Sequence, residues 1–192
     1  TFTVENPNGD TVNPEMKSFT PPPAVALAGG TVTIDYVAAD IGTDVVAVSF
    51  NYKTPTGGSI GVSAVGANGI LPASSPATGT VPANAPTGKY TLEDITVTDF
   101  AWYRTHYKRD GTVTHTPAGA TAPTSHSLDL SAGDFTVVNP NSDTIAPELH
   151  AAARQSPDHV PPGEAVTMTF DASDVGSGLK SVDFFFISPT GG

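Results

Sequence analysis

The sequence predicts an all-β protein built as a β-sandwich. Short segments alternate between apolar and polar residues, which is the period-two pattern of a half-buried strand. Turn pairs such as Asn68-Gly69 and Asp110-Gly111 separate these segments. The 192 residues include 19 Gly and 18 Pro, and 38% of them are hydrophobic, which suffices for a buried core. Many short strands with two faces to bury favour a sandwich over a single open sheet.

The expected strands follow in chain order. Residues 31–37 place three side chains on one face: Val32, Ile34 and Tyr36. Residues 46–53 do the same with Val46, Val48, Phe50 and Tyr52. The remaining expected strands are 59–65, 78–81, 89–98 and 134–138. Residues 147–155 have weak helical character, but their counterpart at 14–20 runs into three prolines, so we expect no helix there.

The sequence contains an internal repeat. Residues 1–16 align with residues 134–149 with ten of sixteen positions identical. The match resumes where residues 36–58 align with residues 170–192, with nine of twenty-three identical. The offset is 133 positions in the first stretch and 134 in the second. A constant offset over two separate stretches indicates tandem duplication.

The offset predicts the domain organisation. Residues 10–142 form one complete sandwich, and residues 1–9 are the closing strand of a preceding repeat. Residues 143–192 are the N-terminal portion of a second repeat, so we expect the chain to be a window of a longer array. In that portion Phe184 and Phe186 take the places of Phe50 and Tyr52 and are expected on a buried face, with Phe185 pointing outward.

Composition excludes several classes of protein. The chain has 8 Lys and Arg against 19 Asp and Glu, a net charge of -11, which argues against binding nucleic acid. No apolar stretch approaches the ~18 residues that a membrane-spanning helix requires, so no membrane insertion is expected. Because cysteine is absent, disulfides, cysteine nucleophiles and thiolate zinc sites are excluded.

The motifs and their order resemble the bacterial immunoglobulin-like repeats of large secreted and cell-surface proteins. Those motifs are Asp-Thr-x-x-Pro-Glu (143–148), Pro-Pro-Gly-Glu-x-Val-Thr (161–167), Asp-x-Gly-Ser-Gly-Leu-x-Ser-Val (174–182), Pro-x-x-Ala-Pro-Thr-Gly-x-Tyr-x-Leu (82–92) and Val-Thr-Asp (97–99). The resemblance implies an immunoglobulin-like sandwich in tandem, outside the cell or on its surface, as a non-catalytic stalk, spacer or adhesive module. It leaves out residues 102–128, where family members have a short hairpin.

Aspartates in the expected loops are candidate calcium ligands. They are Asp10, Asp40, Asp44 and Asp99, with Asp143 and Asp174 repeating the arrangement. Loops of a sandwich can gather at one pole, where carboxylate oxygens would supply part of the 6–8 ligands that Ca²⁺ takes. The alternative interpretation is that these side chains cap nearby backbone amides without a metal.

An aromatic insertion at residues 100–110 is the candidate surface for a ligand or partner. It carries Trp102, Tyr103 and Tyr107, interleaved with basic residues such as Arg104. These side chains suit stacking on a glycan or contact with a surface protein. The alternative is a β-hairpin whose aromatic residues pack on the sandwich while its basic groups face water.

Three functional hypotheses follow. The first is a structural or adhesive module whose partners are neighbouring repeats of the same protein. The second is a self-assembling subunit of a surface layer or filament, in which another copy completes residues 143–192 by strand exchange. The third is a carbohydrate- or protein-binding module that uses the 100–110 loop. An enzyme is not expected, because the histidines His106, His115 and His126, with Ser125 and Asp129, lack any nucleophile context.

Overall fold

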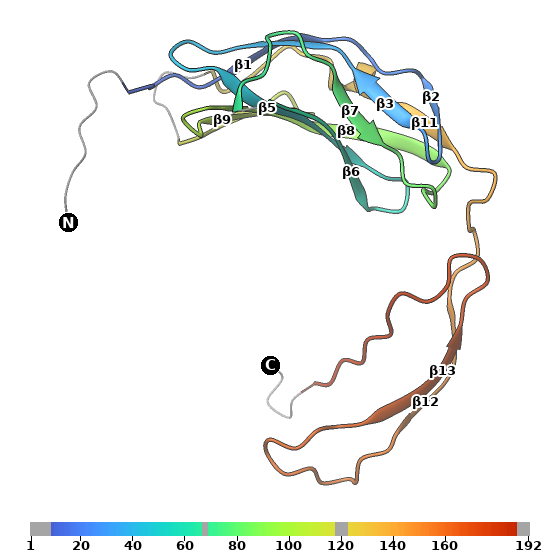
Figure 1. The fold of residues 1–192 in the computed structure, drawn as a ribbon. Coiled ribbons are helices and arrows are strands. Elements are labelled where there is room, and N and C mark those ends of the chain that lie inside the picture. The colour runs from blue at the N-terminus through green and yellow to red at the C-terminus, as the bar shows by residue number, and fades with distance from the viewer. Residues whose placement is uncertain (1–8, 67–68, 118–122, 188–192) are drawn as a thin grey trace. The chain divides into compact units, whose positions relative to one another are not determined.

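The computed structural model describes residues 9–66, 69–117 and 123–187 (Figure 1). The described chain is built of strands with very little helix, so the predicted all-β class is confirmed. No helix in these ranges is long and apolar enough to cross a membrane. Contacts divide the chain into two units, Thr1–Pro140 and Asn141–Gly192. The predicted strand at 1–9 lies outside the described residues except for Gly9.

The described part of the first unit includes eleven strands and the short 3-10 helix η2. They are β1 (Glu15–Phe19), β2 (Val25–Leu27), β3 (Thr31–Ile34), β4 (Tyr36–Ala39), β5 (Val45–Lys53), β6 (Ser59–Val65), β7 (Ala77–Thr80), β8 (Gly88–Asp99), β9 (Arg104–Lys108), β10 (Val113–Thr116), the 3-10 helix η2 (Leu130–Gly133) and β11 (Phe135–Val138). The alternating segments predicted from the sequence correspond to β3–β8 and β11. Strands β1 and β2 were not among the predicted strands. Strands β9 and β10 form a hairpin, which is the alternative interpretation given for the insertion at 100–110.

A large sheet forms one layer of the sandwich. Its strand order is β10-β9-β8-β5-β6-β7-β3, and β11 joins it by pairing with β8. The long strand β8 has β5 along one edge, whereas its other edge pairs first with β11 and then with β9. Strand β11 also pairs in parallel with β2. The insertion at 100–110 therefore extends this sheet, because β9 and β10 continue it beyond β8.

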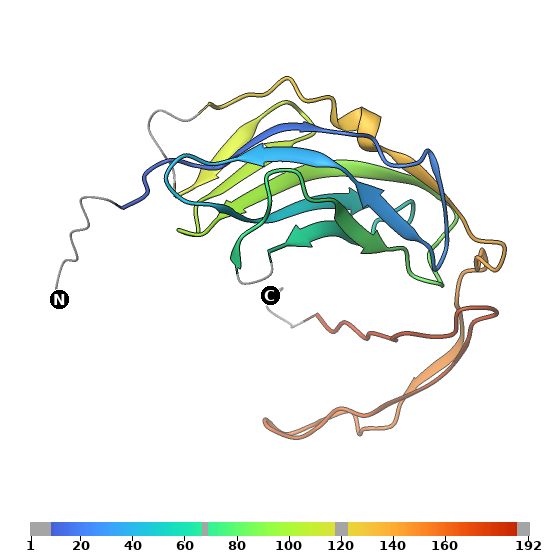
Figure 2. The ribbon, with the colours of Figure 1, turned by 45° about the horizontal axis from the view of Figure 1, so that its top comes forward.

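A two-stranded sheet of β1 and β4 covers the large sheet. Phe19 of β1 and Tyr36 of β4 both pack on Phe50 of β5, with ring centroids 5.8 and 6.2 Å apart. In Figure 2 the blue strands β1 and β4 lie over the teal and green strands of the large sheet. At the other end Phe135 of β11 lies 5.0 Å from the ring of Tyr52. Aromatic pairs thus join the β1–β4 sheet to Phe50 of β5, whereas the Phe135–Tyr52 pair lies within the large sheet.

The predicted strand at 31–37 is two strands that belong to different sheets. β3 pairs with β7 and β4 pairs with β1, and the chain passes from one sheet to the other at Asp35. Burial alternates without interruption across this break, since Val32, Ile34 and Tyr36 are all buried. The even-numbered positions 32, 34 and 36 all point into the core, both before and after the chain changes sheets. Alternation alone therefore does not reveal the break.

The second unit contains the strand pair β12 (Glu148–Arg154) and β13 (Met168–Ser173). This pair has the register of β1 and β4. Glu148 pairs with Ser173 as Glu15 pairs with Ala39, and Leu149 pairs with Ala172 as Met16 pairs with Ala38. A register shift follows at the same place in both pairs, after Met16 and after Leu149. The aligned segments of sequence thus form the same local structure.

One sequence prediction about the second unit is wrong. Residues 181–187 form no strand, and Phe186, which was expected on a buried face, is 65% exposed. Phe185 points outward as expected, with 92% exposure. Phe184 is half-buried against Phe170, with ring centroids 6.0 Å apart. Phe186 stays exposed because the described part of this unit has no second sheet to cover it.

Candidate metal centre

Three aspartates from distant parts of the first unit meet at one point. Asp10 precedes β1, Asp40 follows β4, and Asp99 ends β8. One carboxylate oxygen from each lies within 4.8 Å of the other two. Oxygens that bind one Ca²⁺ at about 2.3–2.6 Å lie up to about 5 Å apart, so this spacing fits ligands of a single ion.

Thr43 links two of these carboxylates. Its hydroxyl oxygen lies 2.7 Å from Asp10 Oδ2 and 3.0 Å from Asp40 Oδ2, so a single proton is shared between two acceptors. The Thr43 amide also donates to Asp40 Oδ2 at 3.1 Å. The other oxygen of Asp10 accepts from the Val12 amide at 2.9 Å. These contacts hold the segment before β1 against the loop after β4.

The loop after β4 needs glycine at position 42. Gly42 has φ of +125°, a conformation that residues with a side chain rarely adopt. A Cβ atom at this position would lie 2.7 Å from Asp10 Oδ1. The absent side chain therefore leaves the space that the Asp10 carboxylate occupies.

Two oxygens of the cluster lack any hydrogen-bond partner. They are Asp40 Oδ1 and Asp99 Oδ2, and both are buried. The Asp99 side chain belongs to a residue with 0% exposure. Among the described residues, no ion pair involves Asp10, Asp40 or Asp99. Burying a charged carboxylate without a partner costs free energy, so a positive charge bound at this point would stabilise the folded protein.

The pKa values of the clustered aspartates also indicate that a positive charge would be favourable there. Burial raises the pKa of Asp99 to about 6, against a smaller opposing effect of the hydrogen bond from the Tyr103 amide. The neighbouring charges of Asp40 and Asp10 raise this pKa further. Burial also raises the pKa of Asp40, and its hydrogen bonds with Thr43 partly offset that effect. A divalent cation would offset the effects of burial and of the neighbouring carboxylates, because its positive charge stabilises the ionised form of each carboxyl group.

The fourth predicted ligand of this unit lies outside the cluster. Asp44 is exposed, and its backbone carbonyl accepts a hydrogen bond from the Phe100 amide at 2.9 Å. The sequence carries a signal for this difference, because the position aligned with Asp44 in the second copy is Gly178. Thr43 and Gly42 were missed as site residues although their aligned positions are Ser177 and Gly176.

The second unit repeats the arrangement around Asp143 and Asp174. Ser177 Oγ lies 2.8 Å from Asp143 Oδ2 and 3.1 Å from Asp174 Oδ2, as Thr43 does with Asp10 and Asp40. Gly176 has φ of +124°, and a Cβ there would lie 2.7 Å from Asp143 Cγ. Asp174 Oδ1, like Asp40 Oδ1, is buried without a partner. No third carboxylate joins this pair among the described residues.

The predicted aromatic site is divided by the structure. Tyr107 lies in the core, and its hydroxyl accepts a hydrogen bond from the Met16 amide at 2.9 Å. Tyr103 is half-buried, whereas Trp102 is 70% exposed and Arg104 is also exposed. Only part of the insertion therefore faces outward, beside the end of β8.

The histidines and their neighbours make local contacts. His126 Nε2 lies 2.7 Å from the Lys108 carbonyl oxygen, and its Nδ1 accepts from the Leu128 amide at 3.1 Å. Asp129 caps the helix η2 by accepting from the Ser131 amide at 2.9 Å. Both ring nitrogens of His126 thus have hydrogen-bond partners. Asp129 binds the backbone of the helix η2 and not a histidine ring.

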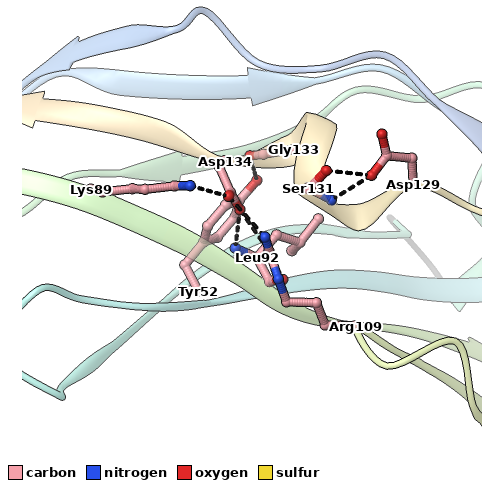
Figure 3. A network of polar contacts seen from close by, with 8 residues as sticks. All are labelled: Tyr52, Lys89, Leu92, Arg109, Asp129, Ser131, Gly133 and Asp134. Carbon is pink, nitrogen blue, oxygen red and sulfur yellow. Dashed lines mark hydrogen bonds and ion pairs between the residues drawn. The ribbon is translucent and has the colours of Figure 1, made fainter.

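Asp134, directly before β11, forms a separate ionic cluster with residues of β8 and of the turn after β9 (Figure 3). Arg109 contacts both oxygens of its carboxylate at 2.8 and 3.0 Å, and Lys89 lies 2.9 Å from one of them. The Leu92 amide donates to the same carboxylate at 2.9 Å. Burial alone would raise the pKa of Asp134, but the hydrogen bonds from Arg109, Lys89 and Leu92 outweigh it and lower the pKa. All its acceptors are satisfied, so this cluster is structural.

The donor set at Asp10, Asp40 and Asp99 consists of hard oxygens, which Ca²⁺ and Mg²⁺ prefer. The three carboxylates offer up to six oxygens, and a loop at the surface leaves room for water as a further ligand. No protein-family model, curated protein or solved structure matches this chain. The function is therefore inferred from the site itself.

Proposed function

We propose that this protein is a non-catalytic, immunoglobulin-like repeat module of a secreted or cell-surface protein, in which Ca²⁺ fixes the entry to each sandwich. The module acts as a spacer or stalk that sets length and stiffness. Its partners are neighbouring repeats of the same kind. The repeated sequence, the acidic cysteine-free composition and the sandwich architecture support this proposal.

The observation that carries the proposal is the position of the three aspartates. Asp10 belongs to the segment that enters the sandwich, whereas Asp40 and Asp99 belong to the sandwich itself. A cation bound to all three would join the entering segment to the sandwich. Without a cation, Asp10 is held, as far as the described residues go, by its hydrogen bonds with Thr43 and Val12.

The repetition of these contacts in the second unit supports a role in the array. Asp143 enters that unit and meets Ser177 in the loop after β13. The hydrogen bond between the entering aspartate and the hydroxyl residue of the loop occurs in both units, at an offset of 133–134 residues. This repetition supports a role for the contact at each junction between repeats. Stiffening each junction is what a spacer requires, because a flexible linker lets successive domains collapse together.

A calcium titration of the full chain tests the proposal. Thermal unfolding is followed in chelator and in rising CaCl₂ at pH 7.5. A ligand that binds only the folded state stabilises it by about 2.7 kcal/mol at a hundredfold excess over its Kd. We expect Tm to rise by several degrees and to return to its starting value with chelator. An unchanged Tm up to 10 mM calcium contradicts the proposal.

Exposed apolar residues of the second unit favour a second candidate function, assembly by strand exchange. Leu149 and Phe170 on the paired strands are 55% and 50% exposed, and Ile187 is 88% exposed. A two-stranded sheet alone is marginally stable in water, so this unit gains stability from further strands. Another copy of the chain could supply them along the open edges of β12 and β13.

The oligomeric state tests this second candidate. Light scattering coupled to size exclusion, over a range of concentrations, should show dimers or larger species. Phe170→Ser should shift these species toward monomers, while Phe100→Ser, an exposed apolar site on the first unit, should not. A chain that is monomeric at high concentration rules out assembly through this unit.

A further inference from the structure

The first unit carries an open cavity of about 480 Å³ beside the end of β8. Its lining comes from β5, β6 and the segment after it, β8, β9 and the turn between β8 and β9. The residues used below are Val65, Thr98, Phe100, Trp102 and Arg104. The volume lies within the range of small-molecule sites. Three of the lining side chains are large, apolar and exposed, namely Val65 at 74%, Phe100 at 60% and Trp102 at 70%.

Hydrogen bonds to Asp99 hold the backbone around Trp102 at the rim of this cavity. Its amide donates to the Asp99 carbonyl at 3.2 Å, and the next amide, that of Tyr103, donates to Asp99 Oδ1 at 2.8 Å. The Asp99 amide in turn donates to the Tyr103 carbonyl at 3.1 Å. An indole that is exposed yet fixed at its backbone loses little conformational entropy when a ligand covers it.

The backbone of Trp102 adopts an unusual conformation. Its φ is +67°, and no other described residue except glycine has a positive φ. This conformation costs a residue with a side chain on the order of 1 kcal/mol, and a glycine would adopt it freely. Strain of this kind persists where the surroundings fix it, and it is frequent at binding sites. Here it accompanies an indole directed to the surface.

Arg104 supplies a positive charge next to the two rings. Its guanidinium makes no ion pair or hydrogen bond with any part of the chain that the structure describes. By contrast Arg109, on the same hairpin, is bound to Asp134 through both of its terminal nitrogens. In a chain with a net charge of -11, an unpaired arginine beside aromatic rings is a site for an anion of the ligand.

We propose that this cavity binds an acidic saccharide, with sugar rings stacked on Trp102 and Phe100 and a carboxylate held by Arg104. A sugar ring has an apolar face and a polar edge, which match the aromatic rings and the hydroxyl of Thr98. A uronic acid adds the carboxylate that an arginine binds through two parallel hydrogen bonds. Asp99 of the aspartate cluster also lines the cavity, so binding is tested without calcium.

Trp102 is also the reporter for the test, because it is the only tryptophan of the chain. Its fluorescence is titrated with trigalacturonate in chelator, which keeps calcium away from both protein and sugar. We expect a saturable change in indole emission. Neutral α-1,4-linked galactotriose should bind at least tenfold more weakly. Unchanged emission with trigalacturonate up to 10 mM, or equal affinity for both sugars, overturns the proposal.

Variants separate the contributions of ring and charge. Arg104→Gln should weaken trigalacturonate binding about tenfold, to the level of the neutral sugar. Lys108→Gln removes an exposed cation from the same strand outside the cavity and should change nothing. Trp102→Gly relieves the backbone strain, so the variant should fold at least as stably and yet lose binding by calorimetry. An acidic peptide, triglutamate, that matches trigalacturonate in affinity overturns the saccharide assignment.

Discussion

Thr43 shares its one hydroxyl proton between Asp40, three residues before it in its own loop, and Asp10, which enters the domain 33 positions earlier. Ser177 makes the equivalent contact with Asp143, across 34 positions. In both units a small hydroxyl residue thus joins the entering segment to the loop after the second strand of a pair. The first unit adds the buried carboxylate of Asp99, and this third charge makes the cluster a candidate cation site.

Asp99→Asn should stabilise the calcium-free protein at pH 7.5 and make it insensitive to calcium. The amide keeps an oxygen for the Tyr103 hydrogen bond and removes one of three negative charges. The gain should be about 1–3 kcal/mol in the free energy of unfolding, measured by urea denaturation in chelator. A destabilised variant would show that Asp99 is already satisfied without a cation.

The same substitution should remove a pH dependence of the calcium-free protein. The pKa of Asp99 is about 6 in the folded protein and 3.8 when unperturbed, so between these values the folded state holds a proton that the unfolded state has lost. Stability therefore falls as pH rises from about 4 to 6 and is lowest, for this group, above pH 6. Denaturation at pH 5 and pH 7.5 should show this fall in the original protein and a smaller one in Asp99→Asn.

Gly42→Ala should abolish calcium stabilisation, and Gly57→Ala should not. Both glycines have positive φ, so both substitutions introduce backbone strain of about 1 kcal/mol. Only at position 42 does the new Cβ collide with the Asp10 carboxylate, since nothing lies within 4 Å of a Cβ at position 57. Thermal melts with and without calcium compare the two. Equal calcium responses would place the ion elsewhere.

Asp40→Asn and Asp174→Asn should differ in their effect on calcium affinity. The two aspartates occupy aligned positions, and each has one buried oxygen without a partner. Only Asp40 has a third carboxylate beside it among the described residues. Calorimetric titration should therefore show affinity lowered at least tenfold by Asp40→Asn and the stronger site unchanged by Asp174→Asn. The reverse ranking would assign the stronger site to the second unit.

Asp134→Asn should destabilise the protein by about 2 kcal/mol at pH 7, because it breaks charged hydrogen bonds to Arg109 and Lys89. The pKa of Asp134 is lowered in the folded state. Its contribution is therefore complete above the unperturbed pKa of 3.8 and is lost as pH falls through the folded value. Urea denaturation of both proteins should show their difference shrinking below pH 4. A constant difference down to pH 2 would mean that charge is not the cause.

The strands that the sequence predicted are those with clear alternation. Residues 46–53 place Val48, Phe50 and Tyr52 in the core, as expected from their period of two. Strand β1 was missed because only Met16 is fully buried in it and proline residues follow it closely. Strand β2, with three residues and no buried side chain, carries too little signal to be recognised.

Part of the candidate metal site could be predicted from the internal repeat of the sequence. Aspartates at aligned positions indicated Asp10 and Asp40, because the same residue in both copies suggested the same role. Asp99 was included because it ends a predicted strand, but its burial comes from the turn that follows and from the neighbouring strands. The role of Gly42 depends on the approach of Asp10 to within 2.7 Å of an ideal Cβ, which no pattern of residues reveals.

A crystal structure of the full chain grown with calcium at pH 7.5 tests the central claim most directly. The account predicts anomalous density for one ion between Asp10, Asp40 and Asp99, with carboxylate oxygens at about 2.3–2.6 Å. Asp40 Oδ1 and Asp99 Oδ2, the two oxygens without partners, should both be ligands. A cluster that holds only water, or a proton shared between the carboxylates, at millimolar calcium would contradict the account.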